Sequence, residues 1–206
     1  MGCMKLQIFC LALVLLAAGC GGGGGGDDPG SGIDPRVARL DAFDAQRVRV
    51  LGDVETGAIG MAPTPDAAIP VTGAADFDGF ATIRVENPGA PLVLYGDTLV
   101  TVGFDTGDAT GAMSAFFGTN ATGEVVDYAG EIAIDAGRIA TDVSLDYGGV
   151  LTEGTNTLVF DGTMTGAFLG DPMAALTTSD LEAEVIYNDG LINATLVVVA
   201  ETPPPP

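Results

Sequence analysis

The chain of 206 residues has no histidine and no tryptophan, and its one lysine, Lys5, lies close to the N-terminus. Without histidine the usual general base is missing, so Ser-His-Asp and Cys-His catalysis are excluded. Without a further lysine, Schiff-base chemistry is excluded as well. A carboxylate pair of the glycosidase kind is compatible with the composition, but the acidic residues follow regular alternation and do not gather. We therefore expect no enzyme activity and no catalytic residues.

Cysteine is also scarce, since the chain has three, at positions 3, 10 and 20. Lys5 precedes an apolar run from Ile8 to Ala18 that is too short to span a bilayer, as is typical of an export signal. Residues 16–20 read LAAGC and resemble a bacterial lipobox, in which the cysteine after the cleavage site receives a diacylglycerol. We predict a signal peptide over residues 1–19 and lipidation of Cys20. An ordinary secretory signal would not account for a cysteine followed by six glycines.

Removal of this signal would take away Cys3 and Cys10 and leave Cys20 acylated, so no free thiol would remain. The sequence thus predicts neither a disulfide nor a thiolate metal site, and we expect no metal and no cofactor. Residues 20–32 consist of the lipidated cysteine followed by a run of Gly, Asp, Pro and Ser. Such a composition is typical of a flexible tether. Gly21 replaces the aspartate that usually retains a lipoprotein in the inner membrane. We expect a lipid anchor in the cell outer membrane, on its periplasmic face or at the cell surface.

Positive charge is the next deficit, because 7 basic residues stand against 28 acidic ones and the formal net charge is −21. Such a charge disfavours nucleic acid and anionic lipid as partners. Basic proteins and cations are compatible with it, although a solvated acidic surface that suppresses association is the simpler explanation.

What the sequence has in abundance is alternation of apolar and polar residues with period two, which predicts half-buried strands. Eight such segments follow one another with no convincing helix between them, and Asn188-Asp189-Gly190 predicts a hairpin turn before the last. Two further turns are expected at residues 135–137 and 148–156. A ninth strand at residues 71–77 is an open alternative. The eight predicted strands are residues 80–86, 99–104, 111–117, 125–135, 139–147, 157–168, 181–187 and 192–200.

Eight sequential antiparallel strands most economically close into a soluble up-and-down β-barrel, and a β-sandwich is the alternative. A transmembrane barrel is disfavoured because the chain has no tryptophan and only 4 tyrosines for aromatic girdles. We assign the barrel domain to residues 67–202 and an extended proline tail to residues 203–206. Residues 33–66 are expected to pack on the barrel, with a short helix over 33–43 and a short strand over 47–51. The arginines at 36, 39, 47 and 49 either clasp acidic barrel loops, which we favour, or form a docking site.

Several stretches together resemble the β-barrel domain of transferrin-binding protein B-like surface lipoproteins, in their short single-barrel form. The resemblance implies an eight-stranded barrel whose loops capture an extracellular protein or a solute. It transfers no transferrin site, since the large members bind through extended loops and an extra domain that this chain is too short to contain. The stretches are the lipobox with its glycine tether and residues 36–40, 73–83, 96–104, 128–130, 162–170 and 198–201.

Three functional hypotheses stay open at this point. The first is a binding module that presents loops to a macromolecule, and the second is a lipocalin-like carrier with a small apolar ligand inside the barrel. The inward aromatic residues Tyr128, Tyr147, Phe160 and Phe168 motivate the carrier, although simple filling of the core is the favoured explanation for them. A structural envelope lipoprotein is the third. Closely spaced carboxylates at residues 76–79 and 105–108 could hold a cation, but turn formation is the default explanation for both.

Overall fold

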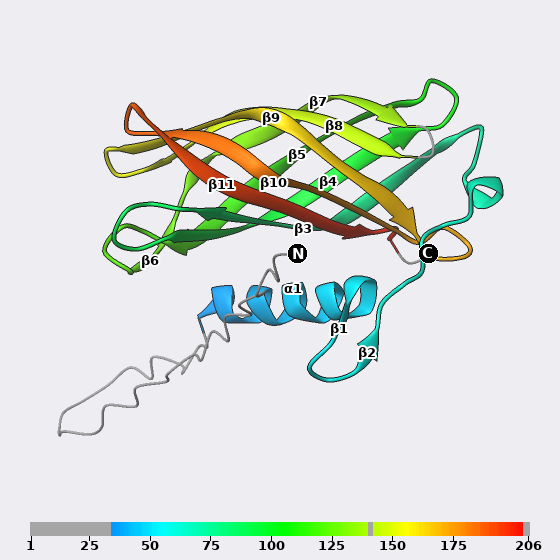
Figure 1. Ribbon diagram of the computed structural model, residues 1–206, viewed down its shortest axis with the longest axis horizontal. Coiled ribbons are helices and arrows are strands. Elements are labelled where there is room, and N and C mark those ends of the chain that lie inside the picture. The colour runs from blue at the N-terminus through cyan, green and yellow to red at the C-terminus, as the bar shows by residue number, and fades with distance from the viewer. Residues whose placement is uncertain (1–33, 140–141, 204–206) are drawn as a thin grey trace, which may run out of the picture. The chain divides into compact units, whose positions relative to one another are not determined.

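Eight long strands form one closed antiparallel barrel (Figure 1) in this computed structural model, which describes residues 34–139 and 142–203. Each strand pairs with its neighbours in the chain, and pairing between the last and the first closes the ring. The prediction of an eight-stranded up-and-down barrel is therefore confirmed, and the β-sandwich alternative is wrong. The strands are β3 (Ala74–Val85), β4 (Leu92–Gly103), β5 (Asp108–Thr119), β7 (Ala129–Ile139), β8 (Val143–Glu153), β9 (Asn156–Leu169), β10 (Ala175–Tyr187) and β11 (Gly190–Glu201).

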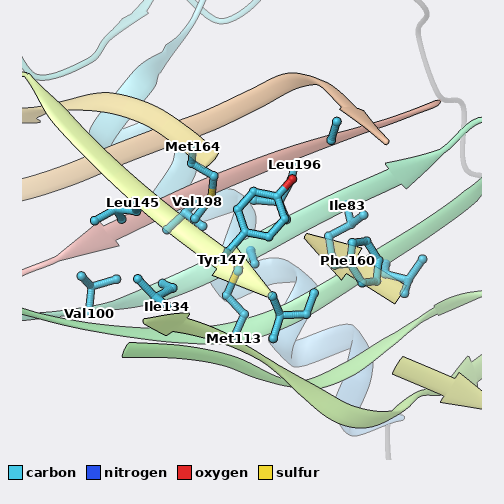
Figure 2. Close-up of a cluster of buried hydrophobic side chains, with 14 of the residues drawn as sticks. Ile83, Val100, Met113, Ile134, Leu145, Tyr147, Phe160, Met164, Leu196 and Val198 are labelled. Atoms are coloured by element: carbon cyan, nitrogen blue, oxygen red, sulfur yellow. The ribbon is translucent and has the colours of Figure 1, made fainter. Parts of the chain in front are cut away.

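Alternation places one face of every strand inside the barrel. In β8, for example, Val143, Leu145 and Tyr147 are at most 3% exposed, while Asp146 between them is exposed. Figure 2 shows inward side chains from β3, β4, β5, β7, β8, β9 and β11 pointing toward one another, Met113 and Met164 among them. The period-two pattern thus identified the core face correctly, because a half-buried strand must keep its apolar residues on one side.

Three expected boundaries were wrong. The turn at 135–137 does not form, since β7 continues to Ile139 and absorbs the irregular residues in a bulge between Ile134 and Ala136. The loop expected at 148–156 shrinks to Gly154 and Thr155, because the glycines before it continue β8. Residues 76–79, interpreted as a turn, lie inside β3, and the optional ninth strand is the start of that same strand.

A single helix, α1 (Pro35–Leu51), replaces the short helix and short strand expected in this region. The side chain of Asp34 accepts the backbone N–H of Arg36, and a proline occupies the first turn, which is a favourable helix start. Phe43, Gln46 and Val50 recur at helical spacing and are the buried residues of α1. The expected strand over 47–51 was wrong because this spacing of three and four continues through it.

Short elements complete the fold. A small hairpin of β1 (Gly52–Asp53) and β2 (Ala58–Ile59) follows α1, and a 3-10 turn, η1 (Asp66–Ala68), precedes β3. The short strand β6 (Val125–Asp127) pairs with β5 just before β7 begins. In the described part of the chain, no helix is long and apolar enough to cross a bilayer.

Candidate binding surfaces

The four aromatic residues that motivated a carrier all lie inside the barrel, but at different levels along it. The Tyr128 hydroxyl donates to the carbonyl oxygen of Thr119 at 2.9 Å, at the end of β5. Phe168 packs against Phe77 and Phe104, with ring centroids 5.6 and 6.0 Å apart, and Phe104 lies just before the start of β5. Tyr128 and Phe168 therefore occupy opposite ends of the barrel and do not converge on one ligand.

Tyr147 reaches from the core to the barrel wall. Its hydroxyl donates to a carboxylate oxygen of Asp180 at 2.9 Å, where the β9–β10 ladder is interrupted between Ser179 and Val185. Burial, together with the carboxylates of Asp180 and Asp161, raises the pKa of Tyr147. Tyr147 therefore stays a neutral hydrogen-bond donor at any physiological pH, and its ring lies across the backbone of Gly162.

Burial also holds Tyr128 neutral, since desolvation and the charge of Glu153 raise its pKa to about 12. The core side chains around these two tyrosines belong to one contiguous cluster. Ile83, Leu94, Met113 and Leu145, from four different strands, are each 0% exposed. Side chains of this size in mutual contact are what fills the interior of an eight-stranded barrel.

Helix α1 packs on the outer wall through aromatic contacts. The Phe43 ring stacks on Phe80 of β3 with centroids 3.5 Å apart and also contacts Tyr95 of β4 and Phe117 of β5. At the C-terminal end of α1, Val50 is fully buried against Leu169 and Val199. An apolar strip of the barrel exterior is thus covered by the helix.

A bulge in β5 supplies one of these contacts. Ala115 has a positive φ of 50°, and the β4–β5 register shifts at this point. As a result the adjacent Phe116 and Phe117 both become buried, Phe116 in the barrel core and Phe117 beneath α1. Sequence reasoning missed this contact, and its signal was the pair of phenylalanines that breaks the alternation.

The arginines of α1 hold acidic groups of the barrel. Arg39 binds the carboxylate of Asp97 and the carbonyl of Ala115, both at 2.9 Å, and its guanidinium lies 4.7 Å from the Phe117 ring centroid. Arg49 binds Glu201 at 2.6 Å, and this hydrogen bond raises the pKa of Arg49. The expected clasp is confirmed for both, although the acidic partners lie on strands and not on loops.

The other two helix arginines have closer partners. Arg36 forms an ion pair with Asp34 at 2.8 Å and lies 3.7 Å from Asp127 of β6. Arg47 pairs with Asp44 one turn earlier in α1. Every arginine of α1 is therefore engaged by a carboxylate of the chain, which does not favour the alternative of a basic docking site.

A hollow of about 420 Å³ lies beside the C-terminal half of α1. Its lining includes Gln46, whose amide nitrogen donates to the carbonyl of Asp78 at 3.0 Å, while its amide oxygen is buried and has no partner within the described chain. The carboxylate of Glu201 in the same lining is held by Arg49. The lining residues are Gln46, Asp78, Ala174, Glu201, Thr202 and Pro203.

In each of the two stretches considered for cations, one carboxylate is held in an internal hydrogen bond. Asp76 accepts the hydroxyl of Thr101 at 2.7 Å, and Asp105 accepts the backbone N–H of Gly73 at 3.1 Å. Across residues 34–139 and 142–203, no group of three or more acidic, histidine or cysteine side chains is arranged to hold a metal ion.

Cys20, the predicted lipidation site, lies outside the described residues, as do the predicted signal peptide and the glycine tether. No protein-family model matches the chain, and a comparison with curated proteins also gave no match.

Proposed function

We propose that this protein is a non-catalytic lipoprotein, anchored in the cell outer membrane through Cys20, that displays a transferrin-binding protein B-like barrel to bind a protein or solute outside the membrane. The lipobox at residues 16–20, the tether and the ordered barrel stretches support this proposal. A lipid on Cys20 would hold the chain at the membrane, and the tether would let the barrel stand clear of the headgroups.

The packed interior carries the proposal. Inward side chains of the barrel, such as Leu94 and Leu145, are 0% exposed, and the aromatic residues lie apart along its length. We therefore expect a ligand to bind at the outer wall or at the loops of the barrel ends. Rigid scaffolds commonly carry their binding residues on such loops.

The anchor is tested by metabolic labelling of the full chain with an alkyne-bearing palmitate in a Gram-negative host. We expect label on the wild-type protein and on the control Cys10→Ser, and none on Cys20→Ser. Mass spectrometry of the processed protein should place the acyl chains on Cys20. Equal labelling of wild type and Cys20→Ser would overturn the proposed anchor. Protease treatment of intact cells then separates display at the cell surface, where the barrel is cleaved, from the periplasmic face.

Ligand binding is tested by native mass spectrometry of the protein purified without denaturation. We expect the mass of the polypeptide with its lipid and nothing more. A co-purifying apolar molecule that is lost on Tyr147→Trp, a substitution that enlarges a core side chain, would favour the lipocalin-like carrier. Crosslinking in intact cells should join the barrel to an external protein. Crosslinks solely to other envelope components would instead favour the structural role.

A further inference from the structure

On the outside of the barrel, four apolar side chains form a line across four neighbouring strands. Each one is the register partner of the next. Val150 of β8 pairs with Val159 of β9, Val159 pairs with Ile186 of β10, and Ile186 pairs with Leu191 of β11. These side chains point outward because their chain neighbours, such as Leu151 and Leu158, are 0% exposed. We name Val150, Val159, Ile186 and Leu191 the apolar row.

The apolar row is open to solvent. Val150 is 43% exposed, Ile186 44% and Leu191 65%, while Val159 between them is partly exposed. Strands lie about 4.8 Å apart, so the row extends for roughly 15 Å across the wall. Leu99 of β4, by contrast, is 50% exposed but stands alone, since its register partners are Asp78 and Ala112.

Carboxylates border the apolar row. Glu131 of β7 pairs with Val150, while Asp161 and Glu184 lie two residues along their strands from Val159 and Ile186, on the same outer face. All three are exposed, and within the described chain none of them forms an ion pair. We name Glu131, Asp161 and Glu184 the carboxylate rim.

None of the five arginines whose side chains the structure describes compensates the rim. Arg36, Arg39, Arg47 and Arg49 belong to α1 and are paired as described above, and Arg84 of β3 binds Glu86 at 2.6 Å. The described charged side chains that border the apolar row are thus all negative. A surface of this kind is complementary to apolar side chains flanked by lysine or arginine.

We propose that the apolar row and the carboxylate rim together bind a basic, amphipathic segment of a partner protein. The apolar side of the segment would cover the row, and its cationic side chains would meet the rim. This inference rests on the proposed function as a binding module and names its surface. A second copy of the chain is disfavoured as occupant, because a formal charge of −21 would meet the same charge across the interface.

The test uses residues 33–206, which form one compact unit with its own core. The probe is a fluorescein-labelled peptide of about 15 residues, made of leucine and lysine placed so that a helix has one apolar face. A peptide with glutamate in place of lysine and a scrambled peptide of the same composition are the controls. Fluorescence anisotropy at physiological salt measures the dissociation constant.

We expect the double variant Ile186→Thr with Leu191→Thr to weaken binding of the probe at least about tenfold, since it removes apolar contact while leaving the charge unchanged. The matched control Leu99→Thr should stay within about twofold of wild type. Threonine retains strand propensity, so the barrel should stay folded. Replacing the rim by Glu131→Gln, Asp161→Asn and Glu184→Gln should also weaken binding about tenfold, whereas Asp41→Asn, Asp66→Asn and Asp108→Asn together should have a smaller effect.

Unchanged binding by the row variant would overturn the proposal, as would equal losses in the row variant and Leu99→Thr. Equally tight binding of the glutamate or the scrambled peptide would overturn it too. Sedimentation that reveals a dimer abolished by the row variant would assign the surface to a second copy. If the row variant unfolds, protection of residues 157–161 and 184–191 from hydrogen exchange by the probe decides the question in the wild-type protein. Crosslinking to an external partner that persists in the row variant would refute this surface and leave the proposed function intact.

Discussion

Gly148 and Gly149 are neighbours in β8 but differ in how closely other strands approach them. A Cβ on Gly149 would overlap the carbonyl oxygen of Glu131 in β7, whereas a Cβ on Gly148 would meet nothing nearer than the Phe160 carbonyl oxygen at 3.7 Å. We expect Gly149→Ala to lower the free energy of unfolding by about 1–3 kcal/mol, because the backbone has to shift. Gly148→Ala, the control, should be neutral or stabilising by about 0.5 kcal/mol. Urea unfolding of both variants measures this, and equal values would contradict it.

The buried tyrosines predict how stability depends on alkaline pH. The pKa of Tyr128 rises to about 12 in the fold, against about 10 in an unfolded chain. A raised pKa means that the unfolded chain releases the proton first, so the stabilisation is complete below about pH 10 and is lost as the pH rises toward 12. Tyr128→Phe removes this pH-dependent contribution to the free energy of unfolding, which is on the order of 2 kcal/mol between about pH 10 and 12. Unfolding free energies at pH 9 and 11.5 should fall less steeply in the variant, and parallel slopes would refute the assignment.

At the scale of elements, Phe43 is the aromatic side chain through which the middle of α1 packs on the barrel. Phe43 stacks on Phe80 and is only 7% exposed. We expect Phe43→Ala to cost about 3 kcal/mol and to speed hydrogen exchange in residues 35–51 more than in the barrel. Val37 lies at an exposed position on the same helix, so Val37→Ala is the matched control. Helix protection that does not change in the Phe43 variant would show that other contacts hold α1 in place.

The strands could be predicted from sequence because each keeps one apolar face, and the Asn188-Asp189 turn because both residues have the positive φ that such a hairpin needs. The full extent of α1 was missed, since Val48 and Val50 alternate with arginine like a strand. The contacts that Val50 makes with Leu169 and Val199 on the barrel wall exist only in the folded chain. The β5 bulge at Ala115 was missed as well, although the adjacent phenylalanines at 116 and 117 break the alternation there. The apolar row could not be found either, because it depends on the exact register between successive strands, which the alternation does not fix.

For the whole molecule, the charge of −21 is the dominant feature. Like charges repel within the compact state, and the ion pairs that oppose this, such as Arg39–Asp97 and Arg49–Glu201, are partly exposed and contribute little each. We expect the thermal midpoint to rise by about 2–5 °C when NaCl is raised from about 0.01 to 0.5 M. A neutral osmolyte of equal molarity is the control for solvent effects other than screening, and a midpoint that falls with salt would contradict the expectation.

The orientation of α1 on the wall has a mechanical consequence. The helix contacts Asp127 near its first turn, Asp97 farther along and Glu201 near its last, so it follows the wall over most of its own length. A pulling force applied at Asp34 would therefore load these contacts in shear, all at once, and would not unzip them one after another. With the proposed anchor at Cys20, drag on the barrel would be shared by all of these contacts.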